Sequence, residues 1–159
     1  MITNEKTYAI YSKYIKKEHF LLFRRIFNFR AKRLGHIPIK TKMCVLPLIS
    51  YDDKTETLDY GQCFTIDVIS MSASSMTVRH HDVLKKGNIL EFRTKHALED
   101  RECLKCMNFK NLPETPSFSS FIGKIIWRSN EEAGVNIIMM REYDKTAILK
   151  MMLANKSKK

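Results

Sequence analysis

The chain has 159 residues, 44% of them hydrophobic and 28% charged, which fits one globular domain and excludes a disordered, collagen-like or low-complexity chain. No apolar run approaches the ~20 residues of a membrane-spanning helix, and the opening residues lack the pattern of a signal peptide, so we expect a cytoplasmic protein without a transmembrane segment. The formal net charge of +11 points to an anionic partner.

Residues 1–33 are expected to form a basic, amphipathic N-terminal helix. Between residues 7 and 32 there is no proline or glycine, and apolar side chains recur three, four and seven residues apart. These 33 residues carry nine lysines and arginines against two glutamates, and a basic tail at 155–159 adds three lysines, so residues 34–154 are close to neutral. We expect the apolar stripe to serve association, as a homo-oligomer or with a partner protein. The charged face is also what a solvated helix surface would carry.

From residue 37 onwards the pattern changes to short β-type runs, each rich in β-branched or aromatic residues and bounded by turn signals. Without intervening helices, such strands predict an antiparallel barrel or sandwich, with Trp127 in its core. The six expected strands are Lys42–Ile49, Gln62–Ile69, Ser75–His80, Asn88–Thr94, Phe121–Arg128 and Gly134–Met140.

Two further segments complete the β-rich part. Residues Lys95–Ser117 lack periodicity and are expected to form an excursion between two strands; they include the CxxC pair Cys103 and Cys106. Zinc would need a second pair of close ligands, whereas Cys44 and Cys63 lie in apolar surroundings and are expected to be small buried side chains, so we predict no metal site. After the last strand, Glu142–Leu153 is expected to form a closing helix.

The sequence holds no set of residues typical of an enzyme. Its five histidines have no metal-binding spacing, no serine lies in a GxSxG context, and no glycine-rich loop could cradle the phosphates of a nucleotide. We therefore expect neither catalytic activity nor a cofactor.

Several segments of the β-rich part resemble a PilZ domain, the bacterial six-stranded barrel whose members bind cyclic di-GMP. The segments are Val83–Phe92, the strand Ile122–Arg128, the strand Ala133–Ile138 and the helix Tyr143–Leu153, and the resemblance covers about residues 32–154. It implies a mainly β fold, namely a six-stranded antiparallel PilZ-like barrel over residues 34–154 with a C-terminal helix, preceded by the N-terminal amphipathic helix.

The resemblance also implies where a ligand would bind. In the family's RxxxR motif, aligned on Ile37–Ile39, Lys32 and His36 stand at the two arginine positions, and Arg33 is beside the first. Arg24, Arg25 and Arg30 in the adjoining helix could compensate, but none of them has the i, i+4 partner that the motif requires. In the family's D/NxSxxG motif, Ser70, Ser72 and Ser75 stand at the three defining positions, so only the middle serine is kept. A lysine replaces a bidentate fork with a point charge, and a histidine is mostly neutral at pH 7, so binding of cyclic di-GMP is expected to be weak or lost.

Two functions remain open at this point. In the first, the protein is a non-enzymatic bacterial signalling protein of the PilZ type that binds cyclic di-GMP and acts as an adaptor for a partner protein. In the second, it binds nucleic acid or an anionic membrane through its basic ends. The serines at 70–75 could equally form an ordinary polar hairpin.

Overall fold

The computed structural model describes residues 35–52, 54–55, 57–79, 83–98, 110–114 and 118–156. The expected N-terminal helix, the CxxC pair and residues 157–159 of the expected tail lie outside these ranges, and so do Arg30, Lys32 and Arg33.

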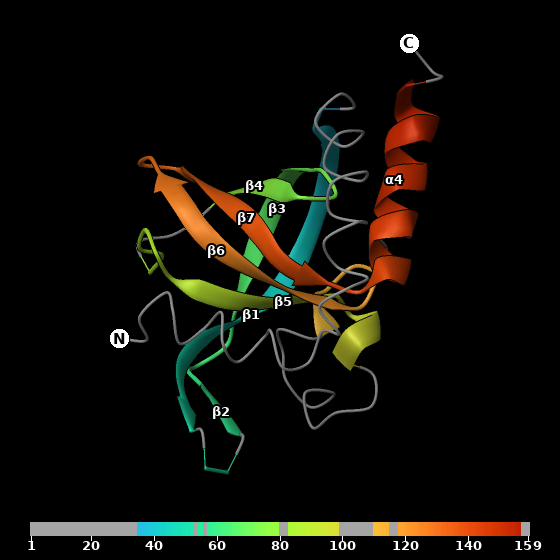
Figure 1. Ribbon diagram of the computed structural model, residues 1–159. Coiled ribbons are helices and arrows are strands. Elements are labelled where there is room, and N and C mark those ends of the chain that lie inside the picture. Colours follow the sequence, from blue (N-terminus) through green and yellow to red (C-terminus); the bar gives the residue numbers. More distant parts are fainter. Residues whose placement is uncertain are drawn as a thin grey trace.

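The described residues form seven strands, a short 3-10 helix and one α-helix (Figure 1). In chain order these elements are β1 (Ile37–Asp52), β2 (Thr57–Tyr60), β3 (Phe64–Met71), β4 (Ser75–Arg79), β5 (Ile89–Arg93), η1 (His96–Leu98), β6 (Ser120–Arg128), β7 (Glu132–Met140) and α4 (Glu142–Lys156).

Six of the strands close into an antiparallel barrel. Their order is β1-β3-β4-β7-β6-β5, and β5 pairs in turn with β1 through residues such as Val45 and Phe92, which completes the ring. The helix α4 follows β7 and lies beside the barrel (Figure 1). The expected mainly β fold, a six-stranded antiparallel barrel with a C-terminal helix, is confirmed.

The strand β1 is longer than expected, and the sequence analysis missed β2. Beyond Pro47, β1 leaves the barrel and pairs with β2 to form a two-stranded ribbon, in which Leu48 lies opposite Tyr60. The ribbon turns where the carboxylate of Asp52 accepts a hydrogen bond from the backbone N–H of Lys54 at 2.8 Å. Because β2 has only four residues and one partner strand, its sequence alone carries little strand signal.

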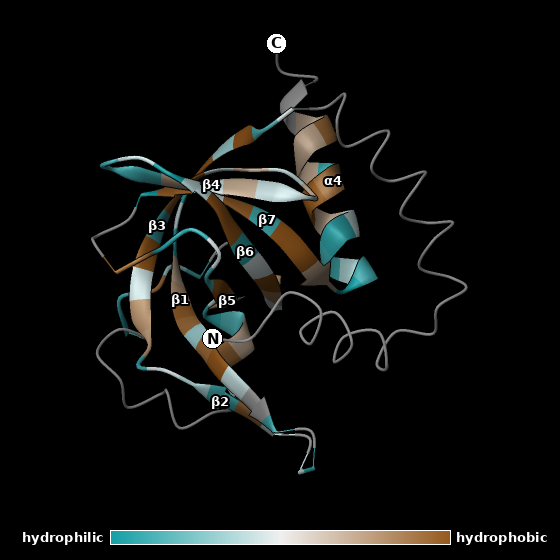
Figure 2. Cartoon of the chain, turned by 60° about the vertical axis from the view of Figure 1, so that its left-hand side comes forward, coloured by the Kyte–Doolittle hydropathy of each residue, from teal (hydrophilic) through white to brown (hydrophobic). Residues whose placement is uncertain are grey.

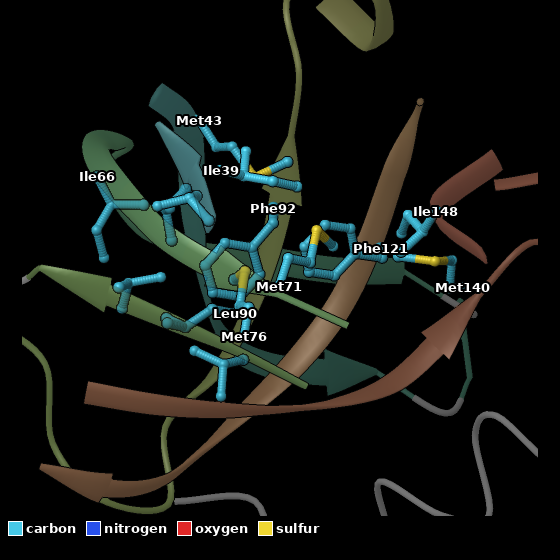
Figure 3. Close-up of a cluster of buried hydrophobic side chains, with 14 of the residues drawn as sticks. Ile39, Met43, Ile66, Met71, Met76, Leu90, Phe92, Phe121, Met140 and Ile148 are labelled. Carbon is cyan, nitrogen blue, oxygen red and sulfur yellow. The ribbon is translucent and has the colours of Figure 1, made fainter. Parts of the chain in front are cut away.

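The core of the barrel follows the alternation of each strand. In β4, for example, Met76 and Val78 are buried while Ser75 and Thr77 are only partly so. Figure 2 shows hydrophobic and hydrophilic residues interleaved along the strands in this way. Large side chains meet at the centre of the barrel, where the rings of Phe92 and Phe121 stack with their centroids 5.1 Å apart (Figure 3).

The helix α4 is fixed to the barrel by apolar and polar contacts. Its Ile148 is fully buried in the core cluster. Its first turn holds the buried Asp144, whose carboxylate accepts hydrogen bonds from the backbone N–H of Ser119 at 3.1 Å and from the hydroxyl of Ser119 at 2.6 Å. Within the described residues, no helix has the length and apolar character to cross a membrane.

A second, smaller apolar cluster covers the outside of β1. It consists of Cys44, Leu98 and Leu112, with Leu46 and Cys63 packed against it. The two cysteines are free; Cys44 is buried as expected, whereas Cys63 is only partly buried. The segment after β5 therefore folds back over the barrel at this point.

Trp127 does not lie in the core, contrary to expectation. Its side chain is on the outer face of the barrel, and 42% of the residue's surface is exposed. The reason is a register shift in the pairing of β6 with β7: Ile125 lies opposite Val135, whereas Trp127 lies opposite Gly134. The extra residue between them returns Trp127 to the outside.

Candidate functional site

His36 links three parts of the chain at one end of the barrel. It directly precedes β1, after Gly35, whose φ of +70° allows the chain to turn there. The ring atom Nδ1 of His36 lies 3.1 Å from the hydroxyl of Ser70, and Nε2 lies 2.7 Å from the hydroxyl of Ser75. A neutral imidazole donates at one ring nitrogen and accepts at the other, and a hydroxyl can match either role.

The strand register explains why these residues meet. Pro38 of β1 pairs with Ser70 of β3, and Ser70 pairs with Thr77 of β4, so the start of β1 lies beside the β3–β4 connection. Since Met71 and Met76 point into the barrel, Ser70 and Ser75 are directed to its outer face. We call His36, Ser70 and Ser75 the His–Ser cluster.

Ser72 shapes the turn beneath the His–Ser cluster. The backbone N–H of Ser72 donates to the carbonyl of Ser75 at 2.7 Å, and its hydroxyl accepts the backbone N–H groups of Ser74 at 3.3 Å and Ser75 at 3.0 Å. Ser72 is buried, with 3% of its surface exposed, and its hydroxyl is 3.0 Å from that of Ser75. Its geometry suits a role in positioning Ser75.

The structure thus brings together four of the seven residues selected from the sequence. His36, Ser70, Ser72 and Ser75 are joined by hydrogen bonds, although 34 residues separate His36 from Ser70. Arg30, Lys32 and Arg33 lie outside the described residues, and their part in the site stays a prediction.

The His–Ser cluster carries little positive charge at neutral pH. Burial of the ring lowers the pKa of His36 below its ordinary value of 6.5, because imidazolium loses hydration more than imidazole does. At pH 7 the cluster therefore offers hydroxyl groups and a neutral imidazole. Such groups can form hydrogen bonds with phosphate oxygens or sugar hydroxyls, and a bound anion would favour protonation of the ring.

The outer face next to the His–Ser cluster holds residues that the sequence analysis did not select. Asn136 of β7 lies opposite Ser75 and is exposed, and Lys124 of β6 lies opposite Asn136. Their outward direction follows from strand alternation, once Val135 and Ile125 are assigned to the core. Alternation within each strand was a signal for this outward direction, whereas the position of the two residues beside the His–Ser cluster follows only from the strand pairing.

The chain was compared with known proteins and with solved structures. No family model matches the chain, and no curated protein matches it. The solved structures that are similar include the inhibitor of motility MotI/DgrA of Bacillus subtilis, with 12% identity, a TM-score of 0.42 and 79% of this chain covered. The chain spans about half of that protein's length (51%).

A second similar structure is the PilZ domain with c-di-GMP of YcgR from Escherichia coli, with 7% identity and a TM-score of 0.40. The match covers 77% of this chain and 91% of that domain. At these identities the similarities concern the fold alone.

Proposed function

We propose that the protein is a non-enzymatic cytoplasmic signalling domain that binds cyclic di-GMP at the His–Ser cluster and passes the signal to a partner protein. The observation that supports this proposal is the pair of hydrogen bonds from His36 to Ser70 and Ser75. These bonds join the two segments that resemble the two ligand motifs of PilZ domains.

The chemistry of the cluster suits a weak site. The hydroxyls of Ser70 and Ser75 can donate hydrogen bonds to phosphate oxygens. Neither they nor His36 can form the bidentate hydrogen bonds with which an arginine guanidinium binds phosphate. Lys32, Arg33 and Arg30 precede His36 in the chain, and the resemblance to the RxxxR motif suggests that they supply positive charge to the ligand. We expect affinity below that of a PilZ domain with both motifs intact.

The hydrogen bond between His36 and Ser75 has the length of a nucleophile–base contact, but its surroundings favour a binding role. In a catalytic triad a carboxylate faces the other ring nitrogen and stabilises the imidazolium that forms. Here Nδ1 of His36 faces the neutral hydroxyl of Ser70. If His36 accepted a proton from Ser75, its contact with Ser70 would provide no negative charge to stabilise the resulting imidazolium.

The test is calorimetry of the full chain with cyclic di-GMP. We expect saturable binding that the substitution His36→Ala weakens at least tenfold, since it removes the residue that joins both segments. His96→Ala is the matched control, because His96 lies in η1, after β5, and should leave affinity unchanged.

The alternative function predicts a different result. Absence of any response to cyclic di-GMP, together with binding to DNA, RNA or anionic vesicles that falls steeply with salt, would contradict the proposal. The basic ends of the chain would then be the binding surface.

A further inference from the structure

We propose that one flank of α4 is the docking surface for the apolar stripe predicted over residues 7–33 of the same chain. The surface consists of Tyr143, Ala147, Met151 and Ala154, and we call it the α4 stripe. Its occupant lies outside the described residues, and the apolar pattern of that segment comes from the sequence. Docking there is independent of ligand binding at the His–Ser cluster.

The α4 stripe is a continuous apolar flank of the helix. Its four residues are spaced four, four and three apart, so they follow one another along one side of α4. Tyr143 is 81% exposed and Met151 is 37% exposed, whereas Ala147 is partly buried. Met151 is also three residues from Ile148, which is fully buried in the core. A segment packed on the α4 stripe would therefore extend the core of the barrel.

The sizes of the side chains suit packing against another helix. Ala147 stands between Tyr143 and Met151, which are its neighbours one turn away in either direction. A small residue between two large ones leaves space for a large side chain of a second helix. The α4 stripe holds no charged residue, which favours an apolar occupant over an ionic one. The predicted apolar stripe supplies large side chains at Leu22, Phe23, Ile26 and Phe27.

The residues before β1 reach the barrel near the end where α4 begins. His36 directly precedes β1 and contacts Ser75 at the start of β4. The last part of β7 lies beside the same turn, because the backbone N–H of Ile137 donates to the carbonyl of Ser74 at 2.9 Å. Since α4 follows β7 after a single residue, residues 1–34 join the barrel close to this helix.

The chain between the two apolar surfaces is long enough to let them meet. Ile37 of β1 belongs to the same buried cluster as Ile148 of α4. Residues 28–34, which separate Phe27 from Gly35, can span up to about 23 Å, and α4 with its 15 residues is about 22 Å long. A short tether keeps two surfaces of one chain at an effective concentration on the order of millimolar, which favours the chain's own α4 over that of a second copy.

The α4 stripe is shorter than the predicted apolar stripe. From Tyr143 to Ala154 it measures about 17 Å, whereas the apolar positions from Tyr8 to Phe27 would extend over about 29 Å of helix. The part nearest the barrel, Leu22–Phe27, is therefore the occupant. The part toward Tyr8 stays available for the association expected from the sequence.

Hydrogen exchange of the full chain, read by mass spectrometry, tests the docking. A solitary helix of this length is only marginally stable in water, so its amides exchange rapidly unless it packs on another surface. Tyr143→Gln together with Met151→Gln removes both large side chains of the α4 stripe and keeps residues that favour a helix. We expect exchange over residues 22–27 to become at least about tenfold faster in this double variant.

The matched control is Leu153→Gln. Leu153 is an apolar residue of the same helix and is 56% exposed, but it lies two residues from Met151 and so faces away from the α4 stripe. Its substitution should leave exchange over residues 22–27 unchanged. Circular dichroism establishes that each variant is folded. Should the double variant fail to fold, Tyr143→Gln alone should accelerate the exchange, since Tyr143 is too exposed to be needed by the barrel.

Light scattering, at the concentrations used for hydrogen exchange, identifies the occupant. Slow exchange over residues 22–27 that is independent of protein concentration, and that the double variant accelerates, supports docking within one chain. Rapid exchange in the unmodified chain, or slow exchange that the double variant leaves unchanged, overturns the inference. Slow exchange only at concentrations where light scattering detects a dimer would assign the α4 stripe to a second copy and overturns it as well.

Discussion

Arg93 holds Glu91 with two hydrogen bonds of 2.7 Å, one from Nε and one from Nη2, in the buried layer outside β5. The two side chains are only 6% and 11% exposed. Arg93 also lies over the ring of Tyr60, with its Cζ atom 5.6 Å from the ring centroid. Arg93 therefore connects the barrel wall with the end of β2 through its contact with Tyr60.

Breaking this ion pair should strongly destabilise the protein. We expect Arg93→Met to lower the free energy of unfolding by about 3–5 kcal/mol, because it removes the two charge-assisted hydrogen bonds that Arg93 donates to the buried carboxylate of Glu91. The double substitution Glu91→Leu with Arg93→Met should regain most of that loss, and urea denaturation measures both. As a control, Lys42→Met removes an exposed pair with Asp67 at 3.9 Å and should cost less than about 1 kcal/mol. Equal effects of the two single substitutions would contradict this expectation.

The hydrogen bonds from Ser119 to Asp144, which hold α4 against the barrel, offer a second test. Asp144→Ala leaves the backbone N–H and the hydroxyl of Ser119 without their acceptor, and should lower the free energy of unfolding by about 1–3 kcal/mol. Hydrogen exchange should rise first in α4, because this contact fixes its first turn to the start of β6. Glu142→Ala, which removes only an exposed pair with Lys145, is the control and should leave exchange in α4 nearly unchanged. Uniform acceleration over the whole barrel would argue against a local anchor.

Gly134→Ala should displace Trp127. The added methyl group would occupy the space of the indole ring, and we expect a cost of about 1–3 kcal/mol in stability and a shift of tryptophan emission toward longer wavelength. Gly61→Ala is a milder control, since its Cβ would meet the Ile49 side chain no closer than 3.3 Å. Unchanged emission in Gly134→Ala would mean that Trp127 does not rest on β7.

Stability and ligand binding should depend on pH through His36 in opposite directions. Since burial lowers the pKa of His36, the unfolded chain binds more protons than the folded one between the lowered pKa and 6.5. The contribution of His36 to stability is therefore complete above pH 6.5 and is lost as the pH falls through the lowered pKa. Urea denaturation of the unmodified chain and of His36→Asn, compared across this range, measures the contribution.

Binding of cyclic di-GMP should instead strengthen as the pH falls, because the phosphates favour the protonated form of His36. Calorimetry between pH ~8 and pH ~6 tests this, within the range where a histidine titrates. Affinity that is independent of pH, or that changes equally in His36→Asn, would place the phosphates elsewhere.

Restoring the two motif residues should strengthen the site. We expect the double substitution His36→Arg with Ser75→Gly to raise affinity for cyclic di-GMP at least about tenfold, because a guanidinium group adds charge-assisted hydrogen bonds. The turn should survive, since Ser72 contacts the backbone N–H and carbonyl of Ser75 as well as its hydroxyl. His96→Arg adds the same charge elsewhere and controls for general attraction. An unchanged affinity in the double variant would show that the site is misplaced.

Much of the fold could be predicted from the sequence because alternation and turn residues act locally. The expected strand at Ser75–His80 corresponds to β4, and the expected closing helix corresponds to α4, which extends through Lys156. Trp127 was misplaced because a register shift between Ile125 and Trp127 inserts one extra residue into β6 and breaks its alternation. Strict alternation of side chains, on which the expectation rested, does not hold across such a bulge.

The candidate site likewise combines residues that the sequence indicated with residues that only the strand pairing placed there. The residues His36, Ser70 and Ser75 were selected from motif positions, and the hydrogen bonds between them follow from the pairing of β1 with β3 and of β3 with β4. Asn136 and Lys124 could not be assigned to this surface before the pairing of β4 with β7 was known. Residues that become neighbours only through non-local strand pairing carry no common signature in the sequence.

Closure of the barrel has a consequence for aggregation. Within the part of the chain that the structure describes, each barrel strand has a hydrogen-bonded strand on both sides, whereas β2 pairs with β1 alone. The ribbon is thus the described region whose edges could template pairing with a strand of another molecule, and Ile49, 58% exposed, makes its surface partly apolar. Asp52, Lys54 and Asp59 place charges along the same ribbon, and edge charges of this kind oppose such intermolecular pairing.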